Sequence, residues 1–180
     1  MKQCPSCKLE LPSAPQRVLE HIGAHILFDP AVKQSSQPCG LCLRPSPICV
    51  FHLKKGKGSK ANLKIDNESS ACANLIAFKY RTASSSGPSN PCTNVPISCP
   101  FCSSTASAVW KYNMKEHLKA KHPHISLSAH TLIWKICETE REEMMRIWSD
   151  RKTIKTKRMS KKRKVPLEIS EAHSSRLALT

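Results

Sequence analysis

The chain has 180 residues, and its composition argues against one large hydrophobic core. Only 5% of its residues are aromatic and 13 are proline, so it needs local cross-links to stabilise small units. Basic residues outnumber acidic ones by 29 to 13, and the net charge of +16 suits a polyanionic partner such as nucleic acid. The chain has no apolar run of 18 residues and no apolar signal segment near its start, so we expect neither a membrane span nor secretion.

Two parts of the chain have the cysteine and histidine spacing of a zinc finger. Residues 1–29 follow C-x2-C-x13-H-x3-H and residues 99–123 follow C-x2-C-x14-H-x4-H. In each, a β-knuckle would supply two thiolates and a helix two imidazoles, which together satisfy tetrahedral zinc. In a reducing compartment this pattern favours zinc over disulfide bonds. The predicted ligands are Cys4, Cys7, His21 and His25 in the N-terminal finger, and Cys99, Cys102, His117 and His122 in the C-terminal finger.

Each finger also has residues suited to a ββα-like fold. Ser13 is expected to cap a helix with Pro15 in its first turn, and Asp29 is expected to end that helix. In the C-terminal finger, Met114 lies three residues before the first histidine, and Trp110 lies one helical turn earlier. We expect both side chains to pack beneath the metal.

The middle of the chain is predicted to be a linker, residues 30–38, followed by a cysteine-rich β unit, residues 39–98. Strands are expected in the runs ICVFHLKKGKG and ANLIAFKYR, with loops between them. The unit has five cysteines, so a four-ligand zinc site would leave one over. The favoured ligands are Cys39, Cys42, Cys72 and Cys92, and the rival set is Cys39, Cys42, Cys49 and His52.

Four consecutive runs in this part of the chain are CGLCLRPSPICVFHLKKGKG, SACANLIAFKYRTA, NPCTNVPISCPFC and AVWKYNMKEHLKAKHP. Together they resemble a large, mostly uncharacterised family of fungal C2H2-type zinc-finger proteins over about residues 37–123. PCTNVP and VWKYNMKEHL are the most specific strings. The resemblance implies zinc binding, and it retains all five middle cysteines. The position of His52 often holds another residue in that family, which weighs against the rival ligand set.

The C-terminal part is predicted to be an amphipathic helix, residues 126–150, followed by a disordered basic tail, residues 151–180. The helix has an apolar stripe that would pack on its neighbours or on a second copy of the chain, and Cys137 within it is expected to be a buried thiol. The stripe consists of Leu132, Ile133, Ile136, Met144, Ile147 and Trp148.

The tail contains ten basic and two acidic residues. The string KKRKV within it is similar to lysine-rich nuclear-import signals, which need an exposed basic segment. We therefore predict a nuclear protein and an import receptor as a partner. The predicted import residues are Lys161, Lys162, Arg163 and Lys164.

Nucleic-acid contacts can be placed by analogy with fingers that read DNA through helix positions −1, 3 and 6. At these positions Arg17 could pair with guanine and Asn113 with adenine, whereas Trp110 is expected to be core. Lysines of the C-terminal finger would contact phosphates without sequence preference. These lysines are Lys111, Lys115, Lys119 and Lys121.

The sequence therefore predicts small α+β units stapled by zinc, in a nuclear protein that binds nucleic acid, with DNA favoured, as a transcription or chromatin regulator. One alternative is a zinc-stabilised protein-interaction module, and another is a non-catalytic protein derived from a mobile element. An enzyme is not expected, because no nucleophile–base pair or phosphate loop stands out. Each finger site also has four protein ligands, which leaves no open position for a catalytic water.

Overall fold

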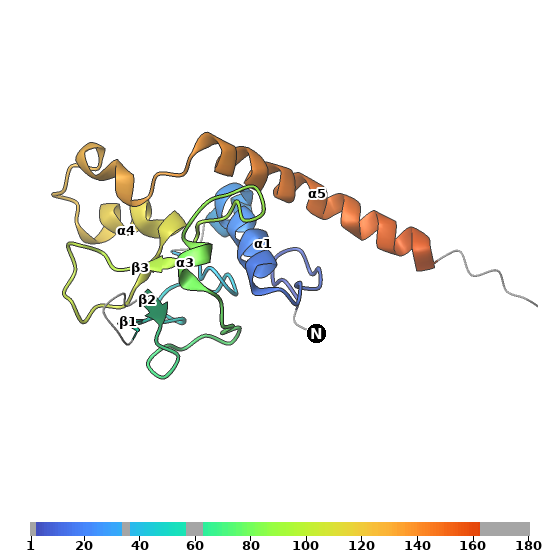
Figure 1. Cartoon of the computed structure of the whole chain (residues 1–180). Helices are drawn as coiled ribbons and strands as arrows, with labels where there is room; N and C mark the ends of the chain where they lie inside the picture. The colour runs from blue at the N-terminus through green and yellow to red at the C-terminus, as the bar shows by residue number, and fades with distance from the viewer. Residues whose placement is uncertain (1–2, 34–36, 57–62, 163–180) are drawn as a thin grey trace, which may run out of the picture. The chain divides into compact units, whose positions relative to one another are not determined.

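The computed structural model describes residues 3–33, 37–56 and 63–162 (Figure 1). It divides into two units, Met1–Ser149 and Asp150–Thr180. The described residues form short helices and two two-stranded sheets, which confirms a small α+β fold. Within this described part, no helix is both long enough and apolar enough to cross a bilayer.

The N-terminal finger consists of a minimal hairpin followed by helix α1, Pro15–Phe28. A single bridge between Gln3 and Glu10 closes the hairpin around the cysteine knuckle. The predicted Ser13 cap is wrong: α1 begins after Ala14, and no side chain caps its first turn. Asp29 ends α1 as expected. Residues 30–38, expected to be a linker, contain the short helix α2, Pro30–Lys33.

The middle segment, residues 39–98, contains less strand than its sequence suggests. Strand β1, Leu53–Lys55, pairs antiparallel with β2, Leu63–Ile65, in a small hairpin. The run ANLIAFKYR, predicted to be a strand, instead leads into helix α3, Tyr80–Ala83. Here the Tyr80 hydroxyl donates to the carbonyl of Pro96, a tertiary contact that overrides the β propensity of the run.

The C-terminal finger has the order strand, knuckle, strand, helix. Strand β3, Pro96–Ile97, pairs antiparallel with β4, Val109–Trp110. A 3-10 turn, η1 (Lys111–Asn113), leads into helix α4, Met114–Lys121. Met114 is fully buried in the finger's own core, as predicted.

Trp110 is buried, as predicted, but it faces a different core. Its ring meets Phe51 of the middle segment edge-to-face at 5.0 Å, and it covers Gly40. A Cβ at Gly40 would lie 2.3 Å from the indole, so only glycine fits beneath this ring. Trp110 therefore joins the C-terminal finger to the cysteine knuckle of the middle segment.

The largest of three hydrophobic clusters among the described residues is shared by several segments of the first unit. It is built from side chains of α1, the middle segment, β4 and the helix that follows the C-terminal finger. Its buried members include Leu19, Leu41, Phe51, Val95, Trp110 and Met144. Because each segment is too short to bury a core alone, the fingers pack together and are not independent beads.

The helix predicted over residues 126–150 is displaced and interrupted. Residues Ser128–Ile133 form a kinked 3-10 segment, η2, and α5 begins only at Glu138 and runs to Lys162. The Cys137 sulfur accepts from the Glu140 amide and so caps α5. Cys137 is exposed, contrary to expectation, and a hydrogen bond with Thr139 lowers the pKa of its thiol.

The apolar stripe of this region is only partly used. Met144 is fully buried, and Ile147 and Trp148 pack against the shared core, but Leu132 is 85% exposed. Residues 151–162 are helical, where a disordered tail was expected, since their lysine, arginine and methionine favour helix. The predicted import signal begins with the last two residues of α5, and Arg163 and Lys164 lie outside the described residues.

Glu140, which interrupts the stripe, fastens α5 to the core. The side chain is 2% exposed, and its Oε1 accepts from the Thr93 amide at 2.8 Å, the Thr93 hydroxyl at 2.6 Å and the Tyr112 hydroxyl at 2.6 Å. The Lys111 ammonium donates to the same Thr93 hydroxyl. Three hydrogen bonds to one buried carboxylate oxygen thus tie the start of α5 to Thr93 and Tyr112.

Replacing Glu140 with alanine should therefore destabilise the first unit. Three buried donors would lose their acceptor, and we expect a loss of about 3 kcal/mol in the free energy of unfolding. Urea unfolding of the metal-loaded protein would measure it. Glu142→Ala, an exposed position on the same helix, removes the same charge and should change stability by less than about 0.5 kcal/mol. Equal effects of the two substitutions would contradict the assigned role of Glu140.

Candidate metal centres

The described residues bring cysteine and histidine side chains together in three clusters of four. In each cluster, one potential ligand atom from every residue lies within 4.8 Å of the others. All ten cysteines are free thiols, so no disulfide competes for them. The clusters are Cys4, Cys7, His21 and His25; Cys39, Cys42, Cys49 and Cys72; and Cys99, Cys102, His117 and His122.

The separations between these atoms match the edges of a metal-centred tetrahedron. Metal–sulfur bonds of about 2.3 Å and metal–nitrogen bonds of about 2.0 Å give edges of about 3.8 Å between sulfurs and about 3.5 Å between sulfur and nitrogen. The Cys39–Cys72 and Cys42–Cys72 sulfurs are each 3.7 Å apart. Hydrogen bonds between neutral thiols are weak and give little reason for four cysteines to cluster. The separations between the sulfur atoms therefore fit four ligands around one metal ion.

The N-terminal cluster joins the knuckle to one face of α1. His21 and His25 lie one turn apart, and their Nε2 atoms are 3.4 Å from the Cys7 sulfur and 3.6 Å from the Cys4 sulfur, respectively. Cys4 is wholly buried, and this burial raises the pKa of its thiol to about 11. A cation is therefore needed to favour the thiolate at neutral pH.

Asp29 contacts the ring nitrogen of His25 that faces away from the cluster and so orients this imidazole. Its carboxylate is 2.8 Å from the Nδ1 of His25 and accepts from the Ser6 hydroxyl at 2.7 Å. Burial alone would raise the pKa of Asp29, but the hydrogen bonds from Ser6 and His25 outweigh this effect, and the pKa is lowered. The bond at Nδ1 turns Nε2 toward the Cys4 sulfur, as in the carboxylate–histidine pairs of known zinc sites. From sequence, Asp29 was predicted only to end the helix.

The middle cluster corrects the predicted ligand set. Cys49 takes the place expected for Cys92, and its sulfur is 3.4 Å from that of Cys42. Cys92 is instead completely buried in the shared core, where its thiol donates to the carbonyl of Leu19. His52, in the rival set, is also outside the cluster. The compact C-x2-C-x6-C spacing was the signal for Cys49, and the extra cysteine was misassigned because a buried thiol and a ligand look alike in sequence.

Four thiols in so small a space cannot all be charged without a cation. Hydrogen bonding from Cys39 and Cys72 lowers the pKa of Cys42 to about 2, and the same sharing of protons raises that of Cys39. One thiolate is thus supported by its protonated neighbours. A bound cation would replace those protons and balance the remaining thiolates.

The C-terminal cluster lies between the knuckle and the end of α4. The Cys102 sulfur is 3.3 Å from His117 Nε2 and 3.2 Å from His122 Nε2, and Cys99 lies 3.6 Å from His122. Burial and the neighbouring His122 lower the pKa of His117. His117 is therefore held as the neutral imidazole, which is the form that binds a metal.

The two predicted base-reading residues, Arg17 and Asn113, make hydrogen bonds within the protein. Asn113 is buried, and its amide donates to the carbonyl of Pro38 at 2.7 Å, so it cannot reach an adenine. Trp110 is core, and Arg17 donates to the buried carboxylate of Glu20 at 2.6 Å. Arg17 and Asn113, the two residues predicted to contact bases, thus make hydrogen bonds that stabilise the fold.

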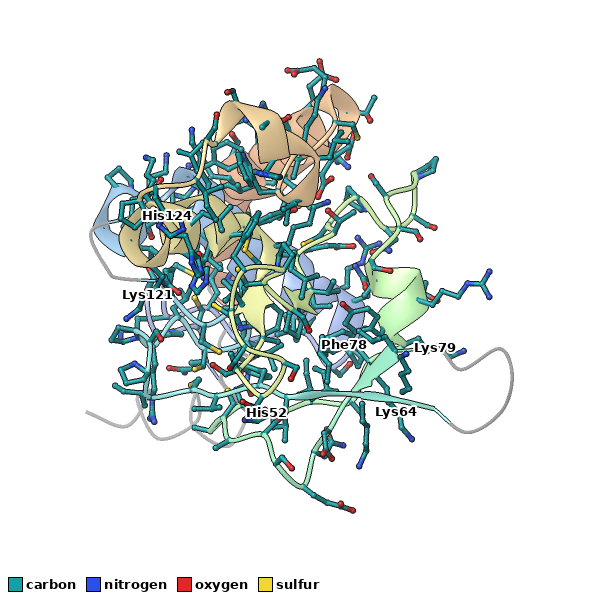
Figure 2. All side chains as sticks on the ribbon, turned by 90° about the vertical axis from the view of Figure 1, so that its left-hand side faces the viewer. His52, Lys64, Phe78, Lys79, Lys121 and His124 are labelled. Atoms are coloured by element: carbon teal, nitrogen blue, oxygen red, sulfur yellow. The ribbon has the colours of Figure 1, made fainter. Side chains whose placement is uncertain are left out.

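The predicted phosphate contacts are better placed. Lys115, Lys119 and Lys121 are exposed on α4, with Lys119 ion-paired to Glu116 at 2.9 Å. Lys111 is only half-exposed and bonded to Thr93. Figure 2 shows Lys121 and His124 together, well separated from Lys64 and Lys79 beside β2 and α3.

Metal stoichiometry distinguishes the two ligand sets for the middle cluster. We expect native mass spectrometry to find three metal ions in the wild type, two in Cys49→Ser and three in Cys92→Ser, because only Cys49 lies among the middle thiols. Loss of an ion from Cys92→Ser with retention in Cys49→Ser would restore the set predicted from sequence.

The Asp29→Asn substitution tests the support of the N-terminal cluster. Ser6 and His25 both bond to Oδ2 and the Ala31 amide donates to Oδ1, so the asparagine NH2 group would have to face one of these donors. Metal affinity at this site should therefore fall about 10- to 100-fold. Competition with a chromophoric chelator would measure the affinity. The C-terminal cluster, which Asp29 does not touch, serves as the internal control, and equal weakening of all sites would argue against a local effect.

No protein-family model matches this chain, and no curated protein or solved structure matches it.

Proposed function

We propose that this protein is a zinc-stabilised module that binds nucleic acid through backbone phosphates and does not read bases. Zinc suits the donor sets, since each cluster offers four thiol or imidazole ligands at tetrahedral separations. Two clusters are of the Cys2His2 type and one is of the Cys4 type. All three are complete with protein ligands, which favours structural over catalytic ions.

One observation carries the proposal: α4 keeps its lysines exposed, whereas two of the three base-reading positions, Trp110 and Asn113, are buried. Lys115, Lys119 and Lys121 face solvent, whereas Asn113 and Trp110 are buried. Phosphate contacts need only exposed cations, and they add affinity without sequence preference. A module with this arrangement is suited to a nucleic-acid backbone.

The rest of the first unit agrees in charge. Exposed lysine and arginine side chains occur on most of its helices and strands. They include Lys33, Arg44, Lys55, Lys64, Lys79, Arg81, Lys135 and Arg141. Such a surface raises the local concentration of a polyanion and speeds association. DNA in a chromatin or transcription setting is the polyanion we favour, with the import-like segment directing the protein to the nucleus.

Salt-titrated binding tests this function. We expect the zinc-loaded chain to bind oligonucleotides of unrelated sequence equally well, with a binding constant that falls as salt rises. Replacing Lys115, Lys119 and Lys121 with alanine should make the slope of log binding constant against log salt shallower by about 2, since each lost phosphate contact contributes about 0.7–0.9.

Two controls sharpen the result. Chelation of the metal should abolish the binding that depends on α4, because small zinc-stapled units unfold without their ion. Changing the oligonucleotide sequence should leave the affinity unaltered. Failure of the wild type to bind DNA or RNA at low salt would end the proposal, and strong dependence on sequence would refute its central feature.

A further inference from the structure

A groove runs beside α4, on the side that a DNA-reading finger would turn toward bases. It consists of two adjoining cavities, with volumes of about 630 and 560 Å³. Leu27, Tyr112, Glu116 and Arg141 line both of them. The walls come from the end of α1, from α2, from the outer face of α4, from η2 and from the start of α5.

These walls border the side of α4 that a DNA-reading finger turns toward bases. A recognition helix must present a bare outer face to a major groove about 12 Å wide. Here Asn113 is buried, and Lys33 of α2 and Arg141 of α5 line the groove beside it, while the Glu116 side chain remains 64% exposed. Glu140 holds the start of α5 in this place through Thr93 and Tyr112. A chain narrower than a duplex would still fit.

The groove has the two chemical features that bind a single strand. Four exposed cations line it, and two half-buried aromatic residues, Tyr112 and Trp134, lie there, of which Tyr112 is held by its hydrogen bond to Glu140. Cations follow the phosphates, and an aromatic ring stacks on bases of any identity. The cations are Lys33, Lys115, Lys135 and Arg141.

The acidic residues of the groove only partly offset this charge. Glu116 is ion-paired with Lys119, a residue outside the groove lining, at 2.9 Å. Glu138 is the other carboxylate, against four cations. Apolar Leu27 and Ile136 complete the floor. The balance is cationic with apolar and aromatic surface, which complements a strand of unpaired nucleotides.

We propose that this groove binds single-stranded nucleic acid, with Trp134 stacking on a base and Lys135 and Arg141 contacting phosphates. This inference rests on the proposed function and names its substrate class. It assigns single strands to the groove, whereas Lys119 and Lys121, in the last turn of α4 and outside the groove lining, contact either form of nucleic acid.

Fluorescence anisotropy with the full zinc-loaded chain tests the groove. The probes are a labelled oligothymidine of about 15 nucleotides and a duplex of the same length. Trp134→Ala should weaken binding of the single strand about tenfold, and Trp134→Phe should weaken it less, because a ring remains to stack. Neither should alter duplex binding. Zinc stoichiometry checks that both variants are folded.

The double substitution of Lys135→Ala with Arg141→Ala is the second arm, since it leaves the packing of Trp134 intact. It should make the salt slope for the single strand shallower by about 1. Lys79→Ala with Arg81→Ala, two exposed cations of the α3 region, removes the same charge outside the groove and should have a smaller effect on the single strand than the groove pair.

The outcomes separate the two proposals. A wild type that binds neither probe defeats the proposed function itself. If the wild type binds and the groove variants bind the single strand with the same affinity as the wild type, only the groove assignment is overturned. The groove assignment also fails if the substitutions weaken duplex and single strand equally, or if the α3 pair matches the groove pair.

Discussion

The shared core of the first unit is the constraint on which the rest of the structure depends. Helix α1, the middle cysteine knuckle, strand β4 and the start of α5 each contribute side chains to it. None of these segments could bury such a core alone, and the same segments carry cysteine and histidine clusters that could hold metal ions. The clusters thus fix local turns, and the core fixes how the turns are placed against one another.

This division explains what could be predicted from sequence. Ligand spacing is local, so the eight ligands of the two fingers and the burial of Met114 and Trp110 followed from their positions. Long-range packing is not local. In the sequence Cys92 looks like a metal ligand, but in the fold its thiol donates to the carbonyl of Leu19 within the core. Glu140 looks like an interruption of an apolar stripe, but in the fold it accepts hydrogen bonds from Thr93 and Tyr112. The prediction of a strand in the run before Tyr80 was wrong because it too depended on a long-range contact, the hydrogen bond from Tyr80 to Pro96.

The same packing changes what the start of α4 can contact. Asn113 is buried, and its amide donates to the carbonyl of Pro38, so this side chain belongs to the fold. Residues of α4 also line two adjoining cavities together with residues of α1 and α5. The lysines of α4 remain exposed, and they add to the positive potential around this part of the protein.

The contact between Trp148 and His25 has a consequence for how such a protein can evolve. The indole meets the ligand ring edge-to-face at 5.0 Å, so residues more than a hundred positions apart border one metal centre. Fingers in tandem arrays can be duplicated, deleted or reordered, since each folds on its own. Here a recombination event between residues 25 and 148 would separate His25 from the indole that packs on it. These two parts of the chain are therefore expected to be inherited together.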